Sequence, residues 1–255
     1  MSFATLLGRK IEYTILPAAK PSLPVLVFLH EGLGSVSMWK EFPARCVERT
    51  GCGALVYSRF GYGFSDPAPS PRAINFLHQE ALETLPQLLD DLRIGPHILV
   101  GHSDGGSIAL IYAGSAEAAR RALEGVVVMA PHVFVERMQL DGIRELRAAF
   151  QSSATRGKLA RHHADADSMF QSWSGAWLDP AFRGWNIEEY LPRIACPVLA
   201  IQGNQDEYGT MEHLDRIARL APNARLLKLD RCGHSPHRDQ PEAILAAIAA
   251  FPGVR

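Results

Sequence analysis

The chain has 255 residues, of which 47% are apolar and 21% charged, and its 26 basic and 27 acidic residues leave a net charge of -1. This composition is that of an ordinary folded domain and excludes a disordered chain, a collagen, a coiled coil and a disulfide-stapled miniprotein. A net charge so close to zero provides no field that would hold a polyanion, so nucleic acid is not expected as a partner.

No apolar run approaches the ~18 residues needed to cross a bilayer, and the first ten residues lack the basic and apolar regions of a secretory signal. The cysteines show no C-x-x-C spacing, so we expect neither a zinc site nor a redox pair. They are Cys46, Cys52, Cys196 and Cys232. We therefore expect a cytoplasmic protein without membrane association, present as a monomer or homodimer.

Short apolar runs alternate with helical patterns along the chain. We expect an edge strand at 10–16 and buried strands at 25–30, 54–58, 97–101, 126–129, 198–202 and 224–229. Helices are expected near 37–50, 75–92, 104–119, 209–220 and 240–251. Strands of this apolar character between helices predict an α/β fold with a mostly parallel sheet flanked by helices. The carboxyl ends of its strands share one edge, where ligands bind in such folds.

Residues 132–192 interrupt this alternation, because they contain no convincing strand and are rich in large side chains. A connection of this length inside a compact domain is usually functional, most often a lid. We predict a helical cap or lid at 132–192, between two parts of an α/β core at 1–131 and 193–255.

The strongest motif is Leu-Val-Gly-His-Ser-Asp-Gly-Gly at 99–106, which contains the pattern G-x-S-x-G around Ser103. It follows an apolar strand and opens a helix, which is the context of a nucleophile elbow. The sharp turn exposes the serine Oγ, and the helix N-terminus favours a developing oxyanion. The simpler alternative is a Gly/Ser turn that only caps the helix.

A serine nucleophile needs a base that an acid holds in place. Asp206 follows the strand at 198–202, and His234 follows the strand at 224–229, so both could converge on Ser103. The chain order Ser, Asp, His is the order of α/β-hydrolases. Other candidates for the base and the acid are weaker: His102 is expected beneath the turn and His237 in solvent, while Glu207 and Asp230 compete with Asp206.

Together these motifs resemble the α/β-hydrolase fold superfamily over nearly the whole chain, including the glycine turn Phe-Gly-Tyr-Gly-Phe-Ser at 60–65. The resemblance implies Ser103 as nucleophile, Asp206 as acid and His234 as base, with a helical cap inserted after the sixth strand in the family's order. It does not fix the substrate, because the fold hosts many reactions.

An oxyanion hole needs two backbone N–H donors. The resemblance implies the N–H of Asp104, the residue after the nucleophile. The loop His-Glu-Gly-Leu-Gly-Ser at 30–35 resembles the family's H-G-x-x-G segment and implies Gly32 as the second donor, with Leu33 as the alternative.

Two carboxylates depart from the usual pattern, because Glu31 replaces a glycine and Asp104 lies directly beside the nucleophile. The simpler interpretation is that Asp104 favours the helix N-terminus and that Glu31 pairs with Arg59 or Arg45. The alternative is that both carboxylates disfavour anionic acyl groups.

Aromatic residues in the predicted cap provide a candidate substrate wall. Phe170, Trp173 and Trp177 share one helix face, which either docks the cap on the core or binds an acyl group. His132 and Phe134 are further candidates for the pocket. The cluster Arg-His-His-Ala-Asp-Ala-Asp at 161–167 matches no metal-ligand pattern and is expected to be a solvated helix face.

These observations predict a serine hydrolase of the carboxylesterase or thioesterase type, with a small-molecule substrate carrying a small-to-medium acyl or aromatic group. No cofactor and no metal are expected. The alternative is hydrolysis of a C–C bond in a vinylogous diketone from aromatic ring fission. Serine at 103 disfavours dehalogenase and epoxide hydrolase chemistry. A ligand-binding receptor on the same fold is the alternative from a different class.

Overall fold

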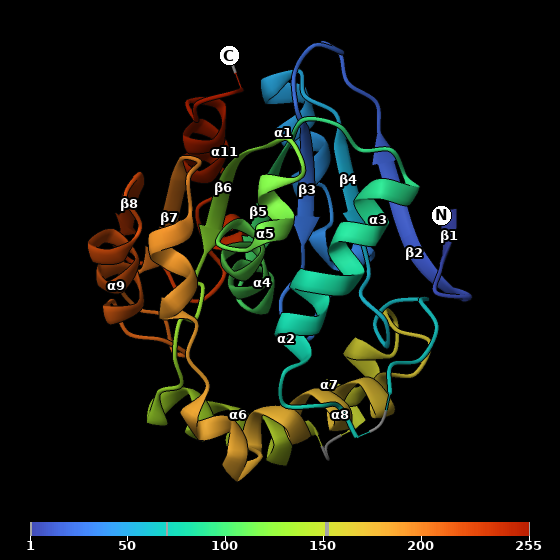
Figure 1. The fold of residues 1–255 in the computed structure, drawn as a ribbon. Coiled ribbons are helices and arrows are strands. Elements are labelled where there is room, and N and C mark those ends of the chain that lie inside the picture. Colours follow the sequence, from blue (N-terminus) through green and yellow to red (C-terminus); the bar gives the residue numbers. More distant parts are fainter. Residues whose placement is uncertain (1, 70, 151–152, 255) are drawn as a thin grey trace.

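The computed structural model describes residues 2–69, 71–150 and 153–254. Within these ranges the chain forms an eight-stranded sheet in the order β1-β2-β4-β3-β5-β6-β7-β8 (Figure 1). The strands are β1 Ser2–Leu6, β2 Arg9–Leu16, β3 Val25–Leu29, β4 Ala54–Tyr57, β5 His97–His102, β6 Leu123–Met129, β7 Val198–Gly203 and β8 Ala224–Leu229. All pairs from β4 to β8 are parallel, whereas β2 is antiparallel to both neighbours. The predicted α/β fold is confirmed.

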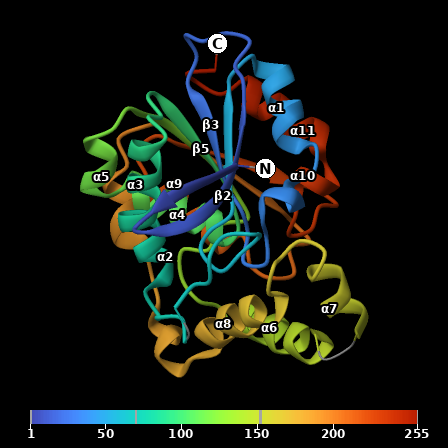
Figure 2. The ribbon, with the colours of Figure 1, turned by 90° about the vertical axis from the view of Figure 1, so that its right-hand side faces the viewer.

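Helices cover both faces of the sheet, with α1, α10 and α11 on one side and α3, α4, α5 and α9 on the other (Figure 2). The helices of the core are α1 Phe42–Thr50, α2 Phe76–Gln79, α3 Leu85–Asp91, α4 Asp104–Ala113, α5 Ala116–Ala119, α9 Glu212–Leu220, α10 Pro236–Asp239 and α11 Pro241–Ala249. Each helix in the described ranges is too short or too polar to span a lipid bilayer.

The sheet separates two apolar cores because successive side chains of a strand point to opposite faces. In β3, Leu26 and Phe28 pack in the core beneath α1 and α11, while Val27 and Leu29 pack in the larger core beneath α3 and α4. All four are completely buried. Burial on both faces explains why the parallel strands are nearly continuous apolar runs.

Two of the predicted elements differ in the structure. The predicted edge strand at 10–16 is not at the edge, because β1 pairs with β2 outside it through a tight turn at Leu7 and Gly8, which both have positive φ. The helix expected at 75–92 contains a π-helical turn at Glu80–Thr84. Pro86 lies one turn later and has no N–H to donate to an α-helical bond, which favours the irregular geometry.

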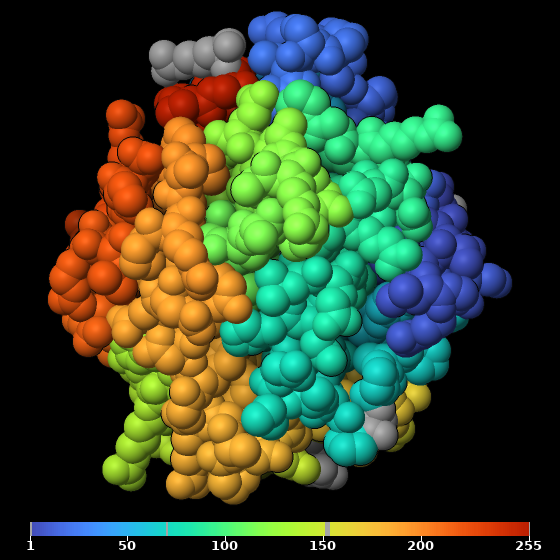
Figure 3. Space-filling model, viewed as in Figure 1, coloured from blue at the N-terminus to red at the C-terminus, as the bar shows by residue number. Residues whose placement is uncertain are grey.

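The segment between β6 and β7 forms α6 Arg137–Phe150, α7 Ser153–Leu159, α8 Ala166–Leu178 and the short 3₁₀ turns Pro180–Gly184 and Glu188–Arg193. Figure 1 shows α6, α7 and α8 beneath the ends of the strands. In Figure 3 the surface of the connection from α8 to β7 (orange) meets that of the α2 region (blue-green), where Phe182 stacks on Phe76 with ring centres 6.1 Å apart.

Candidate active site

Ser103 lies at the tight turn between β5 and α4, with φ 52° and ψ -118°. A non-glycine residue in such a conformation stores on the order of 1–3 kcal/mol of strain, which the surroundings must hold. Two glycines make the turn possible: a Cβ on Gly105 would lie 2.0 Å from the carbonyl oxygen of Leu29, and one on Gly101 would lie 2.3 Å from that of Gly105. The sequence pattern thus has a direct steric cause.

Three of the predicted residues form a continuous hydrogen-bonded chain. The Nε2 atom of His234 lies 2.9 Å from Ser103 Oγ, and its Nδ1 lies 2.8 Å from Asp206 Oδ1. The three residues follow β5, β7 and β8, whose carboxyl ends share one edge of the sheet. This edge brings Ser103 close to Asp206, which is 103 positions later in the sequence, and to His234, which is 131 positions later. A neutral imidazole in this position can accept the hydroxyl proton of the serine.

The carboxylate of Asp206 is held on both oxygens. The Gln202 side-chain amide donates to Oδ2 at 3.1 Å, and the Tyr208 backbone N–H donates to Oδ1 at 2.9 Å. The competing acids have other partners: Glu207 accepts from the backbone N–H of His234, and Asp230 accepts from the Asn204 side chain.

The loop that carries His234 is fixed by a second histidine. Nε2 of His102 donates to the His234 carbonyl oxygen at 2.7 Å, and burial lowers the pKa of His102 to about 4. His102 therefore stays neutral near pH 7 and adds no charge beside His234. The prediction that His237 faces solvent is wrong, because the start of α10 directs its ring against Trp39 and Phe42.

His132 lies on the other side of the nucleophile. Its Nε2 is 3.5 Å from Ser103 Oγ, and its ring stacks on that of His234 with centres 5.7 Å apart. Burial holds the pKa of His132 well below its ordinary value. The imidazole is therefore neutral at physiological pH and does not oppose a positive charge on His234.

The loop at 30–35 is held by bonds to its carbonyl groups. The Glu31 carbonyl accepts from His30 Nδ1 at 2.7 Å and from Arg59 Nη2 at 2.8 Å, while the Leu33 carbonyl accepts from His163 Nε2 at 2.9 Å. The N–H groups of Gly32 and Leu33 donate to no acceptor within the described residues. The N–H of Asp104, first in α4, likewise has no intrahelical acceptor.

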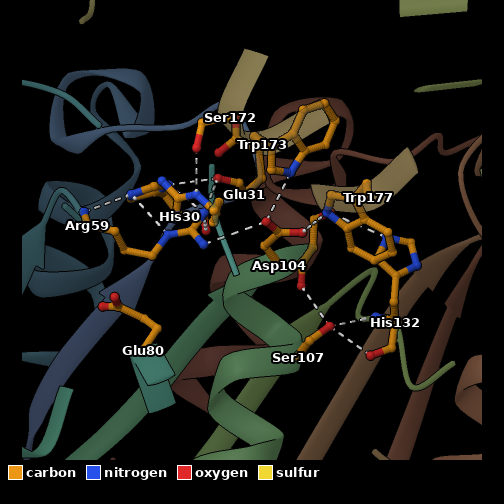
Figure 4. Close-up of polar contacts among 12 residues, drawn as sticks. His30, Glu31, Arg59, Glu80, Asp104, Ser107, His132, Ser172, Trp173 and Trp177 are labelled. Atoms are coloured by element: carbon orange, nitrogen blue, oxygen red, sulfur yellow. Dashed lines mark hydrogen bonds and ion pairs between the residues drawn. The ribbon is translucent and has the colours of Figure 1, made fainter. Parts of the chain in front are cut away.

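Asp104 is completely buried between α8 and Arg59 (Figure 4). The indole nitrogens of Trp173 and Trp177 donate to its two oxygens at 3.1 and 3.3 Å, and Nη1 of Arg59 lies 3.6 Å away. Burial raises the pKa of Asp104, and Arg59 and the Trp173 indole act against that rise. These contacts compensate the charge beside Ser103.

Glu31 has a different partner from those expected. Its Oε1 lies 3.7 Å from Arg238, whereas Arg59 pairs with Asp104 and Arg45 pairs with Glu242. The reason is that Arg59 is completely buried and points into the loop, where it meets the Glu31 carbonyl instead of the carboxylate.

A cavity of about 220 Å³ contains Ser103 and His234 and lies between the strand ends and the helices α6 to α8. Its apolar wall consists of Leu33, Met38, Ile143, Leu146, Leu159, Trp173 and Trp177. Its polar lining consists of Glu31, Asp104, His132, Gln139, Tyr208 and Arg238, together with the backbone of Gly32. The sequence analysis did not single out α6, although Gln139, Ile143 and Leu146 have the i, i+4, i+7 spacing of one helix face.

Two of the predicted pocket residues lie outside this cavity. Phe170 stacks on Phe150 of α6 with ring centres 3.9 Å apart, because it lies two turns before Trp177 on α8, about 10 Å along the axis. Phe134 pairs with Asn186 and packs its ring 4.4 Å from that of His213. Both side chains therefore pack against neighbouring elements and do not line the cavity.

The cluster at 161–167 is only partly solvated. His163 is buried and accepts from the Gly63 N–H at 2.9 Å, so the prediction of an exposed face is wrong for this residue. Asp165 caps α8 through the Ser168 N–H, and Asp167 pairs with Arg156. In the described part of the chain no group of three or more His, Cys, Asp or Glu side chains has the arrangement of a metal site.

The chain that carries this site has counterparts among known proteins. A family model described as "Alpha/beta hydrolase family" matches residues 26–247. The chain belongs to the alpha/beta hydrolase family. This alpha/beta hydrolase is thus an enzyme, as the sequence resemblance predicted.

Individual relatives are distant. The sn-1-specific diacylglycerol lipase ABHD11 of Mus musculus is 24% identical over 266 residues, covering 90% of this chain and 81% of the mouse protein. The solved structure of MGS-M2, an alpha/beta hydrolase enzyme from a Medee basin deep-sea metagenome library, has a TM-score of 0.78 at 20% identity over 97% of this chain and 95% of its own. The meta-cleavage product hydrolase of Pseudomonas fluorescens IP01 has a TM-score of 0.76 at 15% identity, over 98% and 96%. These structures share the fold.

Proposed function

We propose that this alpha/beta hydrolase is a serine hydrolase that cleaves a carboxylic ester or a thioester with a small-to-medium acyl group. The observation that carries the proposal is the chain of hydrogen bonds from Ser103 Oγ through His234 to Asp206, at 2.9 and 2.8 Å. The strained backbone at Ser103 supports it, because such strain is typical of positions that function requires.

In the proposed first step, His234 Nε2 takes the Ser103 proton while Oγ attacks the carbonyl carbon of the substrate. Asp206 holds the imidazole in the correct tautomer and stabilises its cationic form. The N–H groups of Gly32 and Asp104, with Leu33 as the alternative to Gly32, donate to the oxyanion. The charged His234 then protonates the leaving alcohol or thiol.

In the second step, His234 activates a water molecule that attacks the acyl-enzyme carbonyl. The acid leaves and the proton returns to Ser103 Oγ. These steps use only groups of this chain, so no cofactor is proposed.

The size of the cavity supports a small acyl group. Its volume of about 220 Å³ lies below the ~300–1,000 Å³ of cavities that hold drug-sized ligands. Trp173 and Trp177, with Ile143 and Leu146 of α6, provide an apolar wall. We propose that residues 132–192 act as a cap, since α6 and α8 supply much of this wall. His132 and Glu31 are among the polar groups that line the cavity.

Hydrolysis of aryl esters of increasing acyl length, an N-acetylcysteamine thioester and a ring-fission dienoate tests the proposal, each with the wild type and Ser103→Ala. We expect ester or thioester turnover that is lost in Ser103→Ala. The control is Ser174→Ala, which removes a buried hydroxyl without a hydrogen-bond partner in the described residues. Turnover of the dienoate alone would contradict the proposal and indicate C–C hydrolysis.

We further propose that the enzyme works on a small-molecule substrate in the cytoplasm, as a monomer or homodimer. All four cysteines lie in the described part of the chain and are free thiols. Free thiols are typical of proteins from a reducing compartment.

A further inference from the structure

A second hollow adjoins the active-site cavity, between the core and the helices that follow β6. It has a volume of about 210 Å³, and its lining includes Lys40, Lys158, Arg161 and Arg238, with Met38 and Leu159. We call this hollow the basic groove. Met38, Leu159 and Arg238 also line the cavity of Ser103, so the groove and the cavity share a wall.

The charge of the groove is of one sign. Four of its lining residues are cations, and none of its lining residues carries a carboxylate. Within the described residues, Lys40, Lys158 and Arg161 form no ion pair, while Arg238 lies 3.7 Å from Glu31. In a chain whose net charge is -1, this is a local concentration of positive charge, and within the described residues Glu31 is the one carboxylate that pairs with it.

The groove is assembled from elements far apart in sequence. Lys40 follows the 3₁₀ turn Val36–Trp39, and Arg238 lies in α10. Lys158 lies in the last turn of α7, and Arg161 follows that helix. Figure 2 shows α7 on the same side of the molecule as α10. His162, which also lines the groove, joins the two sides through a 2.8 Å hydrogen bond between its Nδ1 atom and Ser37 Oγ.

We propose that the basic groove binds the phosphate groups of a coenzyme A thioester while its acyl group enters the cavity at Ser103. The inference rests on the proposed hydrolysis at Ser103 and names the class of its leaving group. If the leaving group were an uncharged alcohol, the four cations would have nothing to bind. An anionic acyl group is disfavoured because the wall of the cavity at Ser103 is largely apolar. Phosphates on a flexible leaving group match a basic site outside an apolar acyl pocket.

The reaction balances with water as its second reactant. Ser103 Oγ bonds to the thioester carbonyl carbon, the C–S bond breaks, and His234 delivers the proton to the departing thiolate sulfur. Water then releases the carboxylic acid and restores the serine hydroxyl. The basic groove holds the phosphates and takes no part in bond making.

The test compares one acyl group on two carriers. Butyryl-CoA and the butyryl thioester of N-acetylcysteamine present the same bond to Ser103, but only the first carries phosphates. We expect the wild type to prefer butyryl-CoA in kcat/KM. Added salt should reduce this preference, because exposed charges are screened over about 10 Å at 0.1 M. The neutral thioester should show no such salt dependence.

Charge reversal in the groove tests the residues. The double variant K158E/R161E should raise KM for butyryl-CoA about tenfold, since two exposed charge contacts are lost and reversed. Turnover of the neutral thioester should not change. The control is R93E/R225E, which changes the net charge equally at exposed positions after α3 and on β8. It should leave both substrates unaffected.

A binding measurement gives a second readout that does not depend on turnover. Coenzyme A should compete with a neutral aryl ester in the wild type and lose this inhibition in K158E/R161E, whereas pantetheine, which lacks the phosphates, should inhibit neither. Equal kcat/KM values of the wild type for the two thioesters would overturn the inference, and so would an equal effect of K158E/R161E on both thioesters. In either case, turnover of esters would leave the proposed function intact. If the wild type hydrolyses no ester or thioester in a Ser103-dependent way, both the inference and the proposed function are overturned.

Discussion

The indole nitrogen of Trp173 lies 3.1 Å from a carboxylate oxygen of Asp104, the residue that follows the nucleophile candidate Ser103. Trp177, one helical turn later, donates to the other oxygen at 3.3 Å. Helix α8 is thus bonded directly to the turn that carries Ser103. A single buried carboxylate links the position of the helices over the cavity to the position of the nucleophile.

Trp173→Phe tests this link. The variant keeps an aromatic ring but removes the donor to Asp104, and hydrogen bonds to charged groups contribute about 1.5–3 kcal/mol. We expect the free energy of unfolding to fall by roughly that amount in urea denaturation. Trp185→Phe is the matched control, because the indole nitrogen of Trp185 is buried without a partner in the described residues. Equal losses in the two variants would contradict the link.

Gly32→Ala tests the close approach of the loop at 30–35 to α8. A Cβ on Gly32 would lie 2.3 Å from the Trp173 indole nitrogen, so either the loop or the indole must move. We expect a fall in kcat with any ester the wild type hydrolyses, because an N–H group displaced from the oxyanion position costs on the order of 10²–10³ in rate.

Gly175→Ala is the control for the same helix. A Cβ there would meet nothing within 4 Å, and alanine stabilises a helix by about 0.5–1 kcal/mol relative to glycine. This variant should keep its rate and gain stability. Unchanged kcat in Gly32→Ala would indicate that the loop adapts and that Gly32 is not the oxyanion donor.

Much of the fold follows from the chain itself. The strands from β3 to β7 are largely apolar because both faces of the sheet are covered there, and the edge that they share with β8 determines where Ser103, Asp206 and His234 meet. By contrast, β1 was missed because Ser2–Leu6 is short and half exposed, and its pairing depends on one tight turn.

The surroundings of the site were less predictable because they depend on packing between distant segments. The spacing of Phe170, Trp173 and Trp177 identifies a helix face, but not how far along the axis the cavity extends. Whether Glu31 or Asp104 meets Arg59 depends on which way a loop turns. The burial of His237 depends on where α10 packs against Trp39 and Phe42. No local pattern contains this information.

Asp104→Asn separates a structural role of the carboxylate from a role in substrate choice. Arg59 and Asp104 are both completely buried, and removing one partner of a buried ion pair costs about 3–5 kcal/mol. We expect a clear loss of stability in chemical denaturation. Because Arg59 and the two indoles already compensate the charge, the ratio of kcat/KM for neutral and anionic esters should stay the same. A ratio that shifts toward anionic esters would show that the carboxylate repels them.

Four of the buried histidines predict how the stability of the protein depends on pH. Burial lowers the pKa of His102 from 6.5 to about 4, and it holds those of His30, His132 and His237 well below their ordinary value. Between pH 6.5 and 4 the unfolded chain therefore binds protons on these residues that the folded chain does not. Stability should be complete above pH 6.5 and fall as the pH decreases through this window, by up to ~1.4 kcal/mol per pH unit for each such proton.

Urea denaturation of the wild type and His237→Phe across this window measures the effect. The His237 side chain makes no hydrogen bond within the described residues and packs on the rings of Trp39, Phe42 and His102, so phenylalanine can keep these ring contacts. In the variant, the unfolded chain no longer binds the proton of His237. The free energy of unfolding should therefore depend less steeply on pH than in the wild type. Asp104 and Glu80, whose pKa values burial raises, act in the opposite direction in both proteins and cancel in the comparison. Identical slopes would show that His237 titrates alike in the folded and unfolded chain, against the burial that the structure gives it.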